Sequence, residues 1–243
     1  MRSRPVLLAL ASLSAALAGC ASVKYETPGG PAEMSLFVDR DIRAEFSREP
    51  AATRPVYLVL ARIQESGYES YRYRAYGHGR YSFVTVREEA EQDAIPRLEA
   101  LPNLAQIGWL NRLLLPEMLN SERDLRLAGA SLHADMLLLY TYDTRFHTDD
   151  AARPLTVVTL GLSPHRVVAV DTTVSAVLLD VRTGFVYGVC EGSATQKRLA
   201  SAWTDSDQVD RSRRATERDA FDQMIGELEK LWPSVTAKLP EKQ

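Results

Sequence analysis

The chain has 243 residues, with 29 Lys and Arg against 32 Asp and Glu, and a formal net charge of −3. Hydrophobic residues make up 45% and charged residues 25%, which is the composition of a folded globular protein. The acidic balance argues against nucleic acid as a partner, because proteins that bind phosphate backbones usually carry a basic excess.

The first nineteen residues predict an export signal. Arg2 and Arg4 precede an apolar run, residues 6–17, that is too short to span a membrane. The run leads into the sequence LAGC at residues 17–20, which resembles the lipobox of bacterial lipoproteins. The resemblance implies cleavage after residue 19 and acylation of Cys20. An ordinary signal peptide with a chance cysteine is the alternative.

The residues after Cys20 favour the outer membrane as the destination. In the lipoproteins that this segment resembles, an aspartate in the next position favours retention in the inner membrane, and here Ala21 follows instead. Removal of residues 1–19 also removes two arginines, so the mature chain is more acidic than the precursor. We therefore expect the acyl chains, and not a basic surface, to anchor the protein to outer-membrane lipid, facing the periplasm.

The mature chain divides into a tether and one domain. Residues 20–50 are expected to form a lipid-anchored tether, because the stretch 21–33 is polar and rich in proline and glycine. Residues 34–50 are ambiguous between a short helix and irregular chain. Residues 51–243 are of a length that suits a single domain with its own core.

Strands and helices alternate along the first half of this domain. Continuous apolar runs of strand length predict buried strands, and capping residues with apolar spacing predict helices. In chain order the predicted elements are a strand at 56–61, extended chain at 81–87, a helix at 88–100 kinked at Pro96, a short strand at 107–110, a helix at 121–132 and a buried strand at 136–140.

The second half predicts further strands and a final helix. A polar break at 147–153 precedes a strand-like stretch at 155–162, then a long β-branched strand at 167–181, a turn at 182–184 and a returning strand at 185–190. The final helix is indicated by the 3.6-residue spacing of Phe221, Met224, Ile225, Leu228, Leu231 and Trp232. Pro233 is expected to end or bend that helix.

The order of elements predicts the fold class. Strand, helix, strand, helix, strand, a less certain strand, two further strands and a last helix give a mixed α/β (α+β) domain with a single mixed sheet and helices packed on it. Only two cysteines are present. If Cys20 is acylated, Cys190 has no intramolecular partner, and its apolar strand predicts a buried, unpaired thiol.

Three blocks of sequence carry a resemblance to a family. The blocks are ADMLLLYTYD at 134–143, VSAVLLDV at 174–181 and FVYG at 185–188. They resemble the rhombotarget lipoproteins, over roughly residues 50–235. The resemblance implies an envelope lipoprotein of unknown activity, associated with rhombosortase, a rhomboid-type protease of exported proteins.

A more distant likeness adds an expectation about function. The order of a helix, an Ala-Asp apolar strand and the motif LDVRTG at 179–184 is similar to lipoproteins of the curli-secretion-channel type. It is also similar to the lipoprotein activators of penicillin-binding proteins and to the N-terminal domain of TolB. Those folds serve assembly and contact, so the likeness implies a protein that binds and does not catalyse.

Patterns that would indicate catalysis or a metal are weak, and no cofactor is expected. The segment 147–150, HTDD, offers a few metal ligands but is typical of a solvated loop. The segment 161–165, GLSPH, lacks the second glycine of a nucleophile elbow, so we interpret it as a turn. Cys190 with His133 or His165 could resemble the nucleophile and general base of a thiol enzyme, but a buried core cysteine is the better interpretation.

One segment stands out as a candidate contact site. Residues 68–81, the tyrosine ribbon, read YESYRYRAYGHGRY and contain five tyrosines and three arginines. Tyr and Arg are enriched where proteins bind partners. The candidate contact residues are Tyr68, Tyr71, Arg72, Tyr73, Arg74, Tyr76 and Tyr81. The other interpretation is a hairpin or loop whose rings cover its own domain.

These observations favour a lipid-anchored, non-enzymatic envelope protein. We expect it to act as an interaction or assembly factor with an envelope protein as partner, in association with rhombosortase-type processing. The alternative is an envelope hydrolase or maturation enzyme with an unrecognised Ser/His or Cys/His site.

Overall fold

The computed structural model describes residues 26–27, 46–70, 72–150, 166–200 and 206–242. Its strands are β1 (Glu26–Thr27), β2 (Val56–Glu65), β3 (His78–Gly79), β4 (Tyr81–Val84), β5 (Leu104–Trp109), β6 (Met118–Leu119), β7 (Met136–Asp150), β8 (Arg166–Asp180) and β9 (Val186–Ala200). The helices are α4 (Glu89–Asp93), α5 (Ile95–Glu99), the 3-10 turn η2 (Arg112–Leu114), α6 (Glu122–Ser131) and α8 (Ser206–Thr236).

One seven-stranded mixed sheet organises the domain. Its main order is β4-β2-β7-β8-β9, with β5 also paired to β2 and β1 paired to β7. The pairs β2–β5 and β2–β7 are parallel, and the other pairs in this sheet are antiparallel. Strands β3 and β6 form a separate two-stranded ladder. The predicted mixed α/β class with one main sheet is therefore confirmed.

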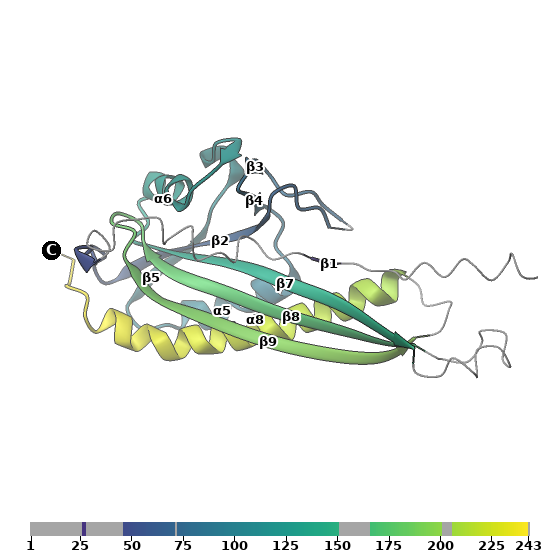
Figure 1. Cartoon of the computed structure of the whole chain (residues 1–243). Coiled ribbons are helices and arrows are strands. Elements are labelled where there is room, and N and C mark those ends of the chain that lie inside the picture. The colour runs from purple at the N-terminus through teal and green to yellow at the C-terminus, as the bar shows by residue number, and fades with distance from the viewer. Residues whose placement is uncertain (1–25, 28–45, 71, 151–165, 201–205, 243) are drawn as a thin grey trace, which may run out of the picture.

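Strands β7, β8 and β9 form a long three-stranded arm. Each has 15 residues, which at a rise of about 3.3 Å per residue corresponds to about 50 Å. Strand β2 pairs with only the first five residues of β7. Figure 1 shows α8 following this arm on one side of the sheet, while α6 lies on the other side.

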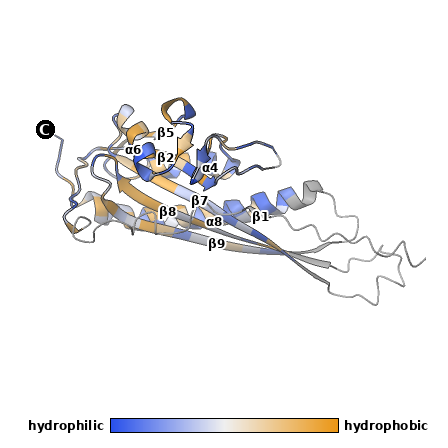
Figure 2. Ribbon diagram, turned by 45° about the horizontal axis from the view of Figure 1, so that its top comes forward, coloured by the Kyte–Doolittle hydropathy of each residue, from blue (hydrophilic) through white to orange (hydrophobic). Residues whose placement is uncertain are grey.

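Two cores lie on opposite faces of the sheet because side chains alternate along each strand. In β2, Leu58 and Leu60 belong to the core beneath α8, whereas Val59 and Ala61 belong to the core beneath α6. Figure 2 shows hydrophobic residues concentrated in the half of the arm nearest these cores, and more hydrophilic residues toward its far end. The distal arm still buries Phe146 and Val170, but polar side chains are more frequent there.

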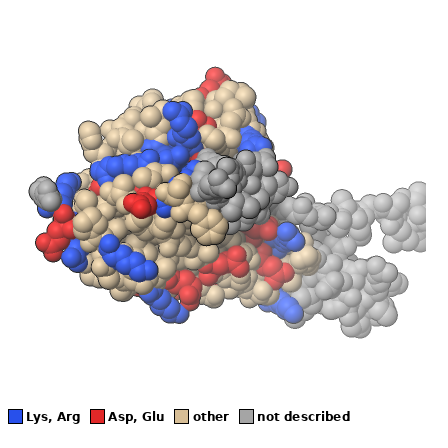
Figure 3. Space-filling model, turned by 60° about the vertical axis from the view of Figure 1, so that its left-hand side comes forward, with Lys and Arg blue, Asp and Glu red and all other residues tan. Residues whose placement is uncertain are grey.

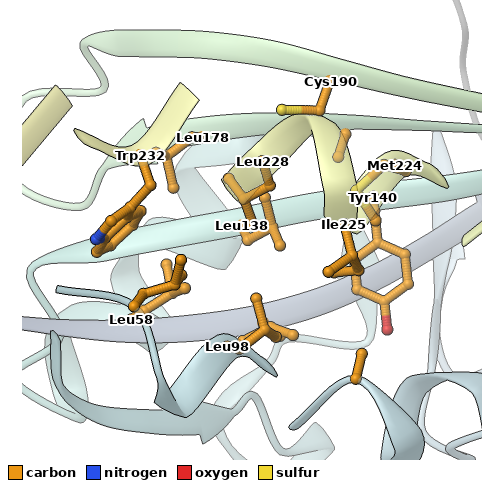
Figure 4. Close-up of a cluster of buried hydrophobic side chains, with 14 of the residues drawn as sticks. Leu58, Leu98, Leu138, Tyr140, Leu178, Cys190, Met224, Ile225, Leu228 and Trp232 are labelled. Carbon is orange, nitrogen blue, oxygen red and sulfur yellow. The ribbon is translucent and has the colours of Figure 1, made fainter. Parts of the chain in front are cut away.

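The apolar stripe of α8 forms the larger core. Five of its six predicted positions are buried and Leu231 is half-buried, so the predicted stripe is confirmed. Figure 4 shows Met224, Ile225, Leu228 and Trp232 facing the sheet residues Leu138 and Leu178. The Trp232 indole donates to the carbonyl of Pro102 at 2.8 Å.

Strand β9 lets α8 approach closely because its inner face carries small residues. A Cβ on Gly192 would lie 2.2 Å from the carbonyl oxygen of Ala220, and one on Gly188 would lie 2.6 Å from Leu231 Cδ2. Cys190 lies between these glycines on the same face and is buried beneath the helix. It is a free thiol, so the predicted burial of Cys190 is confirmed.

The LDVRTG motif is a structural anchor. The buried carboxylate of Asp180 accepts five hydrogen bonds of 2.7–2.9 Å, which we call the Asp180 anchor. The donors are the backbone N–H groups of Ala51, Ala52, Arg182 and Thr183 and the hydroxyl of Tyr187. Burial alone would raise the pKa of Asp180, but these hydrogen bonds outweigh it and lower the pKa. The anchor joins the start of the domain to the β8–β9 turn.

The Ala-Asp motif belongs to the same region. Asp135 is buried just before β7 and accepts from the backbone N–H of Tyr57 at 3.0 Å. Arg182 of the β8–β9 turn donates to the other oxygen of Asp135 at 3.2 Å. The two motifs that carry the more distant resemblance thus hold three chain segments together.

Several sequence expectations need correction. Strand β7 continues through the expected polar break to Asp150, because it pairs with β8 along its whole length. Helix α8 begins at Ser206 and passes Pro233 to end at Thr236. Within the expected tether, Glu26–Thr27 pair with residues 144–145 of β7. The strand-like stretch 155–162 lies outside the described residues.

Candidate functional site

The tyrosine ribbon begins with a hairpin-like turn. The N–H of Ser70 donates to the carbonyl of Tyr73 at 2.8 Å, and the N–H of Ala75 donates to the carbonyl of Tyr68 at 3.0 Å. The chain then pairs Tyr76 with Phe83. Tyr71 lies outside the described residues.

Most of the described rings in the ribbon pack on their own domain. Tyr68 and Tyr81 are buried at 4% and 2% exposure, and the hydroxyl of Tyr81 donates to the carbonyl of Ser121 at 2.6 Å. The prediction of a contact role is therefore wrong for these two residues, because the hairpin folds their rings back onto the body. The half-buried Tyr76 donates to the carbonyl of Leu115 at 3.3 Å.

Two of the remaining contact candidates, Arg72 and Tyr73, line a cleft. Tyr73 is half-buried, and its hydroxyl donates to Glu88 at 3.4 Å. Burial raises the pKa of Tyr73 to about 12, so this hydroxyl is a neutral donor at physiological pH. Arg72 and Arg74 are exposed.

The cleft has a volume of about 590 Å³ and lies between the ribbon, the start of α4 and the first turns of α8. Its lining includes the buried Tyr142 of β7. The lining residues carry five arginines and three glutamates, and they are Arg72, Tyr73, Val86, Arg87, Glu88, Glu89, Ala90, Tyr142, Arg211, Arg214, Ala215, Glu217 and Arg218.

A buried ion-pair network holds the α8 wall in place. Arg213 is 1% exposed and contacts Asp210 at 2.9 Å and Glu217 at 2.5 Å. Glu217 also accepts from the hydroxyl of Thr144 on β7 at 3.0 Å. Burial would lower the pKa of Arg213, but these carboxylates outweigh it and raise the pKa, so the guanidinium stays charged. The network fastens the polar segment of α8, residues 210–218, to the distal arm.

A second buried pair lies deeper in the same region. Arg62 is 2% exposed, contacts Glu91 at 3.4 Å and lies over the ring of Tyr142 at 4.1 Å. Burial outweighs the attraction of Arg62 and raises the pKa of Glu91. The hydroxyl of Tyr142 has no hydrogen-bond partner among the described residues.

Three of the five arginines that line the cleft have carboxylate partners. Asp210 lies 3.6 Å from Arg72 and 3.2 Å from Arg214. Arg218 contacts carboxylates of α4, Glu89 at 2.9 Å and Asp93 at 3.2 Å.

The other two lining arginines are not neutralised by ion pairs. Arg87 lies over the ring of Trp109, 4.8 Å from its centroid, and Arg211 is exposed. Within the part of the chain that the structure describes, neither has a carboxylate within ion-pair distance. At the end of the molecule near the C-terminus, by contrast, basic and acidic side chains lie interspersed on the surface (Figure 3). The cleft therefore presents cationic groups in an acidic chain.

The structure separates the described thiol and base candidates. Cys190 lies in the core beneath α8, whereas His133 is exposed after α6, on the other face of the sheet. Burial raises the pKa of Cys190 to about 11, which disfavours the thiolate. The segment 161–165, with His165, lies outside the described residues.

The described residues contain no group of three metal-ligating side chains. His147, expected in a loop, lies in strand β7, 3.4 Å from Asp171. Within the described ranges, none of the helices combines the length and apolar character needed to cross a bilayer.

Sequence reasoning missed the α8 side of the cleft. The search for an apolar 3.6-residue period detected only the later part of the helix, because the polar segment buries charged residues instead. Asp210, Arg213 and Glu217 are spaced by three and four residues, which places them on one helix face. That spacing of opposite charges was the available signal.

Comparisons with known proteins give only weak structural likenesses. No family model matches the chain, and no curated protein matches it either. A Xanthomonas campestris protein of the DUF330 family is 14% identical, covering 79% of this chain and 91% of that one, with a TM-score of 0.33. A lipoprotein candidate from Caulobacter crescentus is 13% identical, covering 48% and 82%, with a TM-score of 0.26.

A third solved structure is a hypothetical protein from Chlamydia trachomatis. It is 12% identical, covering 77% of this chain and 100% of that one, with a TM-score of 0.33. At these TM-scores, the likenesses carry no conclusion about this chain. The resemblance to the rhombotarget family rests on the sequence blocks alone.

Proposed function

We propose that this chain is a lipid-anchored, non-enzymatic protein of the bacterial envelope that acts as an interaction or assembly factor. The observation that carries the proposal is the cleft between the tyrosine ribbon and α8. Arginine and tyrosine dominate its lining, and these residue types are enriched among the hot spots of protein interfaces. Arg72, Tyr73 and Arg74 would contribute the ribbon side of this contact surface.

The anchor in this proposal is an acylated Cys20 in the outer membrane. The sequence LAGC after a short apolar run supports it. Changing Cys20→Ala should abolish incorporation of labelled palmitate and leave unprocessed precursor, because cleavage and acylation both require the thiol. Incorporation of the label into the variant, or recovery of the mature wild-type protein with the inner membrane, contradicts this assignment.

Site-specific photocrosslinking in cells tests the contact surface. A photoreactive amino acid placed at position 74, an exposed position of the ribbon, should yield one discrete crosslinked protein. The matched control is position 127 on α6, which is 59% exposed on the other side of the sheet. Adding Arg72→Glu should abolish the product from position 74. A product that forms equally from both positions, or from neither, contradicts the proposal.

The association with rhombosortase belongs to the same proposal. It is supported by the blocks at 134–143, 174–181 and 185–188, which resemble the rhombotarget lipoproteins. In a bacterium that encodes both proteins, deletion of this lipoprotein should leave precursors of rhombosortase substrates uncleaved. Normal processing in the deletion strain contradicts the association.

A further inference from the structure

The cleft has the dimensions of a specific binding site. Its volume of about 590 Å³ falls within the range of about 300–1,000 Å³ that is typical of ligand pockets. The polar segment of α8 and the start of α4 are held by ion pairs across the cleft, such as Arg218 with Glu89. Because Asp210 positions Arg72, Arg213 and Arg214 together, the walls are organised before any ligand arrives.

The charges that remain available in this cleft are cationic. Arg87 and Arg211 line it without a carboxylate partner among the described residues. A guanidinium group presents a planar set of N–H donors that matches a carboxylate in two parallel hydrogen bonds. Such a bond is stronger in a partly enclosed cleft than on an open surface, because less water screens it.

Polar groups in the lining favour a peptide over a dense anionic surface. Glu88 and Glu89 lie among the arginines of the lining, so the positive charge of the cleft is interrupted and does not match the continuous phosphates of a phospholipid surface or a nucleic acid backbone. A peptide can place its carboxylates beside the free arginines and its N–H groups beside the glutamates.

We infer that the cleft between the tyrosine ribbon and α8 binds an acidic peptide segment of the partner protein, with Arg87 and Arg211 as the carboxylate-binding groups. The inference rests on the proposed function and names the chemistry by which the partner is recognised. The ion-paired arginines Arg72, Arg214 and Arg218 position the walls of the cleft.

The test uses the full acylated chain in detergent and a fluorescein-labelled hexaglutamate peptide. Fluorescence anisotropy should show saturable binding that weakens as salt is added, because the contacts are between charges. Arg211→Glu should weaken binding about tenfold or more, and Arg87→Gln should weaken it by a smaller factor. The matched control is Arg123→Glu, an exposed arginine of α6 on the other side of the sheet, which should leave the affinity unchanged.

Three results would overturn the inference. One is hexalysine binding as tightly as hexaglutamate, and another is an equal loss in Arg211→Glu and Arg123→Glu. The third is competition by inorganic phosphate at the same concentration as glutamate residues, which would make the ligand a phosphate and not a peptide carboxylate. Unchanged melting temperatures of the variants ensure that lost binding reports the cleft and not the fold.

The inference and the proposed function can fail separately. A crosslinked partner at position 74 that persists with Arg211→Glu, combined with no hexaglutamate binding, overturns the inference and leaves the proposed function standing. Saturable hexaglutamate binding that is sensitive to Arg211→Glu supports the inference even if no crosslinked protein forms in cells. In that case the interaction role, and not the ligand chemistry of the cleft, is wrong.

Discussion

Helix α8 is attached to one sheet by two different kinds of contact. Its later part, the apolar segment 220–236, packs Phe221, Met224, Leu228 and Trp232 into the main core. Its earlier part, the polar segment 210–218, is held to the same sheet by the buried network centred on Arg213.

The difference follows from what each part of the sheet offers. Near the body, the strands present residues such as Leu138 and Leu178 to the helix. Along the distal arm they present Thr144 and Thr172, whose hydroxyl groups lie 3.1 Å apart and next to Glu217. A buried charge is tolerated only where partners satisfy it, so the polar segment depends on every member of its network. Of the four predictions that follow, ordered from the largest expected effect to the smallest, three test this contrast and one tests the Asp180 anchor.

The apolar segment should respond most strongly to loss of volume. Trp232→Ala should reduce the free energy of unfolding by about 3–5 kcal/mol, because it removes a fully buried ring and leaves a cavity. Urea denaturation of the full chain measures this change. The exposed Lys238→Ala, near the end of the chain, is the control and should change stability by less than about 0.5 kcal/mol. A loss for Trp232→Ala of the same size as the control would show that the apolar segment is not needed.

The polar segment should respond to an unpaired charge and not to volume. Arg213→Met should cost about 3 kcal/mol, because Glu217 then remains buried without its cation and Asp210 keeps only the more distant Arg72 and Arg214. Adding Asp210→Asn and Glu217→Gln should recover most of this loss, since no buried carboxylate remains uncompensated. Denaturation of the single and triple variants measures both effects. A triple variant as unstable as the single one would mean that Arg213 acts through packing alone.

The Asp180 anchor should make stability depend on acid pH. Because the folded protein lowers the pKa of Asp180, its stabilisation is fully present above the unfolded-state pKa of about 4 and is lost as pH falls through the folded-state pKa. Asp180→Asn should cost about 1.5–3 kcal/mol at neutral pH and less in acid. Thermal unfolding between about pH 2 and 7 measures this, with the exposed Glu99→Gln as control. An equal loss at every pH would contradict the assigned charge.

Cys190 offers the finest test, because it reports opening of the apolar segment alone. Labelling of its buried thiol by a disulfide reagent should be slow in the native protein and rise on unfolding, since burial also raises its pKa to about 11. Trp232→Ala should accelerate labelling more than Arg213→Met does at equal global stability. Equal acceleration would show that the two segments of α8 open as one unit.

Local sequence patterns determined much of this fold. The strands at 56–61 and 136–140 and the apolar stripe of α8 follow from runs and periods of apolar residues, which bury the same way in many contexts. The turn at 182–184 follows from Arg-Thr-Gly, where Gly184 adopts a positive φ of 71°. The order of these elements indicated a single mixed sheet.

Only one side of the candidate site, the tyrosine ribbon, could be predicted from the sequence. Composition identified the tyrosine ribbon, yet it could not separate the buried rings of Tyr68 and Tyr81 from the exposed Arg72. That distinction depends on whether the hairpin folds toward the body or away from it. The α8 side of the cleft was missed because its charged residues look solvent-exposed until their partners are known.

The sequence by itself determined where the apolar strands and the apolar part of α8 lie, since those depend on neighbours along the chain. Only the tertiary structure decided that α8 begins at Ser206, that β7 continues to Asp150 and that a cleft forms beside the ribbon. Each of these depends on partners far away in sequence. Thr144 and Glu217, for example, are 73 residues apart. A buried polar contact is stable only when both partners are buried next to each other, and a local sequence pattern does not show which distant residues will be neighbours.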